Sequence, residues 1–125
     1  MAKFRKIALA FPVIAGYEEE VVVGVEEFAR RHGSWAIFGG PTRSYLSLKQ
    51  LRGWAGDGVI TMLNSQDEVS AGRDLRLPIV NVSGALAEPG FPTVVSDQRA
   101  IGRMAAKELL GCEVQTFAFY GFKDA

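Results

Sequence analysis

The 125-residue sequence contains little of the chemistry on which most enzymes and metal sites depend. It has one cysteine, Cys112, and one histidine, His32. A single cysteine excludes an internal disulfide, and these two residues alone cannot form a metal site with local ligand spacing. Cys112 follows an apolar stretch, so we expect a small buried side chain rather than a reactive thiol. The sequence therefore predicts no metal site.

The sequence also lacks a long hydrophobic run and an excess of charge of one sign. No stretch approaches the roughly 20 apolar residues that span a membrane. The apolar run 7–15 contains Pro12 and is soon followed by three glutamates, unlike a secretory signal. Fourteen basic and 14 acidic residues give a formal charge of zero, whereas nucleic-acid-binding surfaces are usually strongly basic. We expect a cytoplasmic chain with no membrane partner.

What the sequence does contain is an alternation of short apolar runs with amphipathic segments. The apolar runs predict strands over residues 7–11, 35–38, 58–63, 78–82, 93–95 and 116–120. Helices are predicted over residues 18–31, 48–55, 65–75 and from Ser96 or Asp97 to Leu110. Strands that alternate with helices imply right-handed crossovers and a parallel sheet. The expected fold is α/β, a three-layer doubly wound parallel sheet in one domain.

The helix patterns predict which side chains face the core. In the first helix the predicted core face is Val21, Val25, Phe28 and Ala29, and in the last helix it is Ile101, Met104, Ala105 and Leu109. The segment 65–68 has the sequence of a capping box. His32 falls in the last turn of the first helix, where it can bond free carbonyl groups.

The chemistries that this fold often carries are not supported. The turn 12–17 holds one glycine and is followed by Glu18, Glu19 and Glu20, whose negative charge would repel the phosphates of a dinucleotide. A P-loop lysine is absent, and no phosphoacceptor aspartate ends the third predicted strand. No nucleophile with a partner base is evident. We therefore expect neither an enzyme nor a cofactor.

Polar, unreactive side chains follow the ends of the predicted strands. They are Tyr17, Asn64, Ser65, Ser83, Ser96, Asp97, Gln98 and Lys123. In parallel sheets ligands bind beyond the carboxyl ends of the strands. An aromatic ring among hydroxyl, amide and carboxylate groups suits a polyhydroxylated ligand such as a sugar. The alternative is that Ser65 and Asp97 are helix caps and Asn64 is a turn residue.

Several collinear segments resemble regulators of xylose operons. They are 16–25 (GYEEEVVVGV), 51–60 (LRGWAGDGVI), 77–84 (LPIVNVSG), Ser96-Asp97 and 117–121 (FAFYG), and they cover nearly the whole chain. The element Asp57-Gly58-Val59-Ile60, with a later aspartate that opens a helix, is shared more widely by the lac-repressor and periplasmic sugar-binding superfamily. The segments 41–47 and 83–92 depart from the family pattern, which leaves the identity of the sugar open.

This resemblance implies that residues 1–125 form the N-terminal lobe of a two-lobe, periplasmic-binding-protein-like (flavodoxin-like) effector domain. A pentose, D-xylose above all, would bind between the lobes and favour their closure. Tyr17, Asn64, Ser83 and Asp97 are the candidate ligand residues by their position. Relatives carry a helix-turn-helix domain after the second lobe and dimerise through the first, which makes Val22 and Val23 candidate dimer contacts. Because the chain ends at Ala125, we expect the second lobe and the DNA-binding domain to be absent from this truncated form.

Two other functions stay open at this stage. One is a sugar-binding protein of a transport system, which the lack of a signal segment disfavours. The other is a stand-alone flavodoxin-like interaction domain that binds no sugar.

Overall fold

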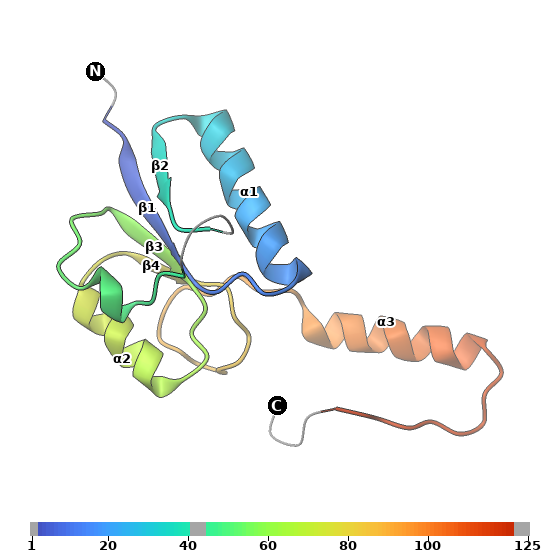
Figure 1. The fold of residues 1–125 in the computed structure, drawn as a ribbon. Coiled ribbons are helices and arrows are strands. Elements are labelled where there is room, and N and C mark those ends of the chain that lie inside the picture. Colours follow the sequence, from blue (N-terminus) through green and yellow to red (C-terminus); the bar gives the residue numbers. More distant parts are fainter. Residues whose placement is uncertain (1–2, 41–44, 122–125) are drawn as a thin grey trace. The chain divides into compact units, whose positions relative to one another are not determined.

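The computed structural model describes residues 3–40 and 45–121. The chain divides into two units, and the boundary along the sequence falls between Val94 and Val95. The first unit contains a four-stranded, all-parallel sheet (Figure 1). Its strands are β1 (Arg5–Ala10), β2 (Trp35–Phe38), β3 (Gly58–Thr61) and β4 (Ile79–Asn81), in the order β2-β1-β3-β4. The strand order reverses beside β1, as in doubly wound sheets. The predicted α/β fold is confirmed.

Helices cover both faces of this sheet. Helix α1 (Gly16–His32) packs on one face, where Val22 meets Leu9 and Phe11. Helix α2 (Gln66–Leu75) and the short 3-10 helix η1 (Lys49–Leu51) cover the other face, where Val69 and Leu51 join Ala8 of β1. The small residues Ala8 and Ala10 therefore lie on the face that α2 and η1 cover. The larger residues Leu9 and Phe11 lie on the face that α1 covers.

The predicted core face of α1 is confirmed in part. Val21 and Val25 are half-buried and pack against the cluster of Leu9, Phe11 and Val22, whereas Phe28 is 46% exposed. Val22, which lay outside the predicted face, is the buried residue of this helix at 2% exposed. Val22 as a dimer contact is therefore wrong, because it is a core residue. Val23 remains exposed.

Two polar hydrogen-bonding predictions for helix ends are confirmed. Ser65 caps α2, because its Oγ accepts from the Glu68 backbone N–H at 3.3 Å. His32 lies in the last turn of α1, with Nδ1 3.0 Å from the Phe28 carbonyl oxygen, and its ring stacks on Phe28.

The predicted fifth strand is reduced to one bridge. Thr93 pairs with Asn81 in parallel, and the Val94 N–H donates to the Asn81 carbonyl at 2.9 Å. This contact holds the end of the first unit against β4. It is too short to form a ladder because Pro92, which precedes Thr93, has no N–H to donate.

The second unit contains one helix, α3 (Gln98–Gly111), close to the predicted bounds. Residues 116–120 were predicted as a sixth strand, and that prediction is wrong: the segment forms no strand, and Phe119 is 93% exposed. A strand exists through hydrogen bonds to a neighbour, which local sequence does not specify. The predicted inner face of α3 is likewise exposed, with Met104 at 66%.

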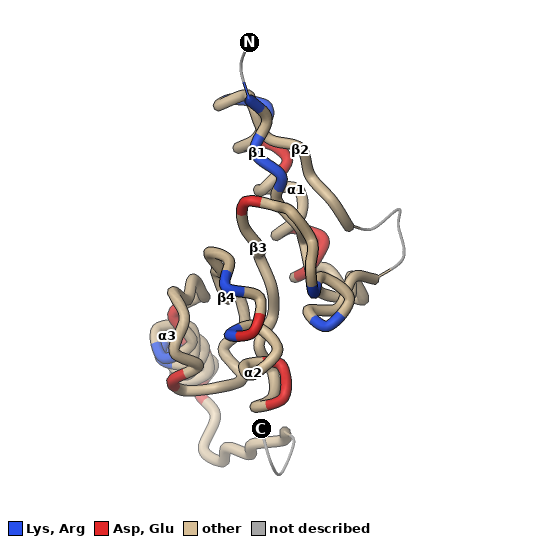
Figure 2. The backbone as a smooth tube through the Cα atoms, turned by 90° about the vertical axis from the view of Figure 1, so that its left-hand side faces the viewer, with Lys and Arg blue, Asp and Glu red and all other residues tan. Residues whose placement is uncertain are grey.

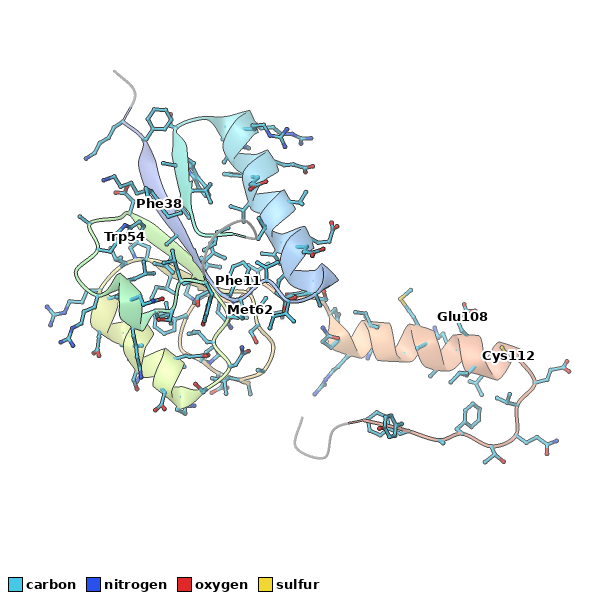
Figure 3. The ribbon with its side chains drawn as sticks, viewed as in Figure 1. Phe11, Phe38, Trp54, Met62, Glu108 and Cys112 are labelled. Atoms are coloured by element: carbon cyan, nitrogen blue, oxygen red, sulfur yellow. The ribbon has the colours of Figure 1, made fainter. Side chains whose placement is uncertain are left out.

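Cys112 corrects another prediction. It is exposed rather than buried, and its Sγ donates to the Glu108 carbonyl one turn earlier at 3.3 Å (Figure 3). It follows the last residue of α3, where the apolar stretch stops being helical.

Candidate functional site

The candidate site lies where β1 and β3 end side by side. The register pairs Ala10 with Thr61, and Thr61 in turn with Asn81 of β4, so three carboxyl ends meet at one edge. In the strand order β2-β1-β3-β4, β2 lies on one side of β1, and β3 and β4 lie on the other. Open α/β sheets bind ligands at such a switch point. Phe11 and Met62, which continue these strands, lie close together in the core (Figure 3).

A cavity of about 260 Å³ opens at this edge. Its floor is formed by strand-end residues, and its polar wall comes from the segment before η1 and the first turn of α2. The lining residues are Ala10, Tyr45, Ser47, Leu48, Lys49, Thr61, Met62, Ser65, Asp67, Glu68 and Ala71. Its volume lies just below the range of about 300–1,000 Å³ that is typical of small-molecule pockets.

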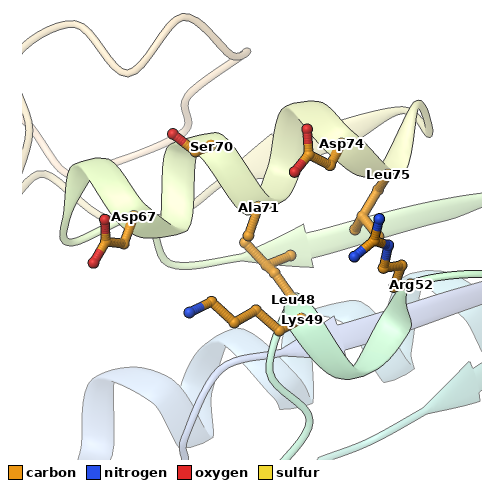
Figure 4. A pocket seen from close by; sticks show the side chains of 8 residues that line it. All are labelled: Leu48, Lys49, Arg52, Asp67, Ser70, Ala71, Asp74 and Leu75. Carbon is orange, nitrogen blue, oxygen red and sulfur yellow. The ribbon is translucent and has the colours of Figure 1, made fainter.

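A second cavity of about 400 Å³ adjoins the first, sharing Leu48, Lys49, Asp67 and Ala71 with it. It runs between η1 and α2, where Leu48, Ala71 and Leu75 point toward one another (Figure 4). Asp67, Ser70 and Asp74 point outward from α2 (Figure 4). Its apolar floor and outward charges are those of a helix-packing groove, so the edge cavity is the better ligand site.

Asn81 is the structural centre of the edge. It is 0% exposed, and its Oδ1 accepts from the backbone N–H groups of Leu63 at 2.9 Å and Ser83 at 3.0 Å. Its Nδ2 donates to the Ser83 carbonyl at 2.8 Å and to Thr93 Oγ1 at 3.2 Å. One amide therefore joins the loop after β3, the loop after β4 and the bridge at Thr93.

Two of the predicted ligand residues lie together on this support. The Ser83 hydroxyl donates to Asn64 Oδ1 at 2.5 Å and accepts from the Ala85 N–H at 3.2 Å. Asn64 is exposed and Ser83 is half-buried. The pair presents uncharged hydrogen-bonding groups from two neighbouring strand ends.

Tyr17 joins the same edge from α1. Its hydroxyl donates to the Val82 carbonyl at 2.7 Å, next to Ser83, while its ring is 47% exposed. The first turn of α1 is thereby tied to the end of β4, and the exposed ring remains accessible to a ligand.

Replacing Tyr17 with Phe is expected to lower the free energy of unfolding by about 1 kcal/mol, because one partly buried hydrogen bond is lost. Urea unfolding followed by tryptophan fluorescence measures the change. Tyr120→Phe is the control, since its hydroxyl is fully exposed. Equal stability of the two variants would show that the Tyr17 bond contributes nothing.

The first turns of α1 and α2 carry acidic side chains that bond to the chain itself. Glu18 Oε2 accepts from the Ala15 N–H at 3.1 Å, and Glu68 Oε2 accepts from the Asn64 N–H at 2.6 Å. Burial and, to a smaller extent, the Glu68 carboxylate raise the pKa of the Tyr45 hydroxyl. Tyr45 therefore stays a neutral donor in this cavity.

The remaining strand-end residues are placed as follows. Asp97 belongs to the second unit, where its Oδ1 accepts from the Ala100 N–H at 2.9 Å and caps α3. Its part in a ligand site remains a prediction. Ser96 and Gln98 lie in the same unit, and Lys123 lies outside the described residues.

Sequence reasoning missed three residues of the edge. Asn81 and Thr61 were placed inside apolar strands, and a fully buried amide or hydroxyl in such a strand was itself a signal. Thr61 Oγ1 donates to the Ala10 carbonyl at 2.7 Å and so joins β3 to β1. Tyr45 carried no local signal, because it reaches the cavity from an irregular segment.

The comparisons with known proteins agree with this architecture. A family model described as the XylR N-terminal domain matches residues 6–97. The chain belongs to the XylR N-terminal domain family. The matched residues contain the parallel sheet except Arg5, the residues of the candidate cavity and the start of the second unit.

Curated relatives give the same family. The chain is 32% identical over 129 residues to a xylose operon regulatory protein of Escherichia coli K12, and 27% identical over 128 residues to one of Haemophilus influenzae. These alignments cover 98% and 97% of the chain but 32% of each relative, so the chain spans about a third of their length. No solved structure matches the chain.

No helix of residues 3–40 and 45–121 is long and apolar enough to cross a membrane. In the same residues, no group of three or more His, Cys, Asp or Glu side chains could hold a metal ion.

Proposed function

We propose that this chain is the N-terminal, sugar-sensing lobe of a transcription regulator that responds to a pentose, D-xylose above all. The observation that carries the proposal is the family match over residues 6–97, together with relatives that are named xylose operon regulatory proteins. The regulator acts without catalysis, in the cytoplasm, and contacts DNA through a domain outside these residues.

The chemistry of the edge supports a sugar ligand. Asn64, Ser83 and Tyr45 offer an amide, a hydroxyl and a phenol, and the exposed ring of Tyr17 can cover an apolar sugar face. Sugars are bound by such combinations of aromatic surface and fixed polar groups. The edge cavity forms one wall, and a second lobe supplies the other.

The mechanism is a shift between open and closed arrangements of two lobes. A ligand moves such an equilibrium by its differential affinity for the two states. D-xylose that bonds Asn64 and Ser83 on this lobe and groups on the other lobe stabilises the closed state. In a homodimer formed through the N-terminal lobe, closure changes the spacing of the DNA-binding domains.

The test is small-angle scattering and operator binding by the complete gene product with and without D-xylose. We expect D-xylose to reduce the radius of gyration and to change the affinity for operator DNA. Ser83→Ala should weaken the response to D-xylose about tenfold, since a buried sugar hydroxyl would lose its partner. Arg30→Ala, a substitution at an exposed position in the last turn of α1, serves as the control. An unchanged radius and unchanged operator affinity at saturating D-xylose would contradict the proposal.

A further inference from the structure

An apolar hollow lies on the face of the sheet that α1 covers only in part. Its volume is about 440 Å³, and every residue that lines it belongs to the first unit. Valines and isoleucines form most of its wall, among them Val21 and Val25 of α1, Ile60 of β3, Val80 of β4, Val82 and Val94. Val94 is 66% exposed. The hollow shares no lining residue with the cavity at the carboxyl ends of the strands.

The hollow has the place of one missing helix. Packed helices lie about 8–10 Å apart, which is about two strand spacings, so four strands take about two helices on each face. One face has α2 and η1. On the other, α1 is the one helix of residues 3–40 and 45–94, and it packs on Leu9 of β1. The half of this face over β3 and β4 is therefore left uncovered.

The uncovered half is apolar along the strands and charged at one end. The strands β3 and β4 contain no charged residue and are tan in Figure 2, and Ile60 pairs with Val80. Arg5 and Asp57 line the end of the hollow at the amino ends of β1 and β3. Asp57 Oδ2 already accepts from the Lys6 N–H at 2.7 Å. The remaining cation, Arg5, suits the negative C-terminal end of a helix that runs antiparallel to the strands.

The fold limits what can occupy this position. The crossover from β3 to β4 carries its helix, α2, on the opposite face, and further right-handed crossovers in the same direction keep to that face. A second sheet cannot stack here, because α1 projects beside the hollow by about the 10 Å that separates stacked sheets. A helix from elsewhere in the polypeptide fits. The chain spans 32% of the curated relatives' length, so most of a regulator of that length lies outside residues 1–125.

We propose that the sheet face over β3 and β4 is the docking site for one amphipathic helix of the complete regulator, from outside residues 1–125. The inference rests on the proposed function, since it takes this chain to be part of a longer regulator. The helix places leucine, isoleucine or valine side chains against Ile60, Val80 and Val94. The first unit therefore completes its core only in the complete regulator.

The test compares thiol reactivity in the 125-residue chain and in the complete gene product, without sugar. Val94→Cys is made in a Cys112→Ser background, and its reaction with iodoacetamide is followed by mass spectrometry of the peptide and normalised to the urea-unfolded protein. In the 125-residue chain the thiol should react as fast as that of Ser70→Cys, a control at an exposed position of α2. In the complete gene product the Val94→Cys thiol should react about tenfold more slowly or less, because it reacts only when the helix opens, while Ser70→Cys keeps its rate.

A charge at the same position gives a second readout. Val94→Asp should change the melting temperature of the 125-residue chain by less than about 3 °C, since the side chain is exposed there. In the complete gene product it should lower the first melting transition by about 5 °C or more, because the carboxylate would be buried under the helix. Val94→Leu keeps an apolar contact and should leave both proteins within about 3 °C of the wild type.

Each other occupant gives a distinct result that would overturn the inference. Protection of Val94→Cys in the 125-residue chain that grows with protein concentration would assign the face to a second copy. Protection there that is independent of concentration would assign it to residues 95–125. Equal, fast reaction in the 125-residue chain and in the complete gene product would show that the face stays open.

The response to D-xylose separates this inference from the proposed function. If the Val94→Cys thiol is protected in the complete gene product but D-xylose leaves operator binding unchanged, the docked helix stands and sugar sensing is contradicted. If D-xylose changes operator binding but the thiol reacts equally fast in both proteins, only the docked helix is wrong.

Discussion

Replacing Asn81 with Ala is expected to lower the free energy of unfolding by about 3 kcal/mol. The amide makes four hydrogen bonds inside the protein, and its removal leaves the buried N–H of Leu63 without the partner it has in the wild type. An unsatisfied buried donor carries its full desolvation penalty. Urea unfolding followed by the fluorescence of Trp35 and Trp54 measures the loss.

Two matched variants sharpen this prediction. Asn64→Ala removes an exposed amide that accepts one side-chain hydrogen bond, so its effect should stay below about 1 kcal/mol. At low pH, where its carboxyl group is protonated, Asn81→Asp keeps the acceptor for Leu63 and Ser83 and has one O–H donor in place of the two N–H donors. Its loss of stability should therefore lie between those of Asn81→Ala and Asn64→Ala. Equal stability of Asn81→Ala and Asn64→Ala would refute the bracing role of Asn81.

Replacing Gly39 with Ala is expected to destabilise the chain by about 3 kcal/mol or more, through strain and overpacking together. Gly39 ends β2 with a φ of +93°, and an added Cβ would lie 2.5 Å from the Leu9 carbonyl oxygen. Because this oxygen belongs to the central strand β1, it cannot move without disturbing the sheet. A thermal or urea unfolding curve gives the change in stability.

Gly53→Ala is the matched control for Gly39. Gly53 has a similar φ of +81°, but an added Cβ would meet nothing within 4 Å. It should therefore show the backbone strain alone, about 1 kcal/mol. The difference between the two variants measures the clash with Leu9. If Gly53→Ala is as harmful as Gly39→Ala, the close approach of β2 to β1 has no energetic consequence.

Local sequence signals predicted the parts of the fold that depend on neighbouring residues. The apolar runs gave β1 and β3 because both faces of a parallel strand are covered. Ser65 and Glu68 predicted the start of α2, because the cap is a hydrogen bond between residues three positions apart. The order of these elements was enough to predict a parallel, doubly wound sheet.

The failures concern contacts between residues far apart in the chain. Val21 and Val25 of α1 were predicted to face the core and do so, but Val22 was not, because its burial depends on contacts with Leu9 and Phe11. Residues 116–120 have the composition of a strand but no hydrogen-bonded neighbour in the part of the chain that the structure describes. Composition cannot supply that neighbour.

The candidate site was predicted in part. Tyr17, Asn64 and Ser83 do converge at one edge, because the carboxyl ends of parallel strands must meet there. The residue that holds them in place, Asn81, was read as part of a strand. Two of its partners, Leu63 and Thr93, lie 18 and 12 residues away in the sequence, so only the fold reveals its role.

The most direct test of sugar sensing by this lobe is a D-xylose titration of the 125-residue chain, followed residue by residue through backbone amide shifts. One wall of a cleft should bind weakly, with a Kd in the millimolar range, about 4 kcal/mol. The account predicts saturable shifts at Asn64, Ser83 and Tyr17 that are reduced in Ser83→Ala. Saturating D-xylose that leaves these three amides unmoved, or moves only residues elsewhere, would contradict it.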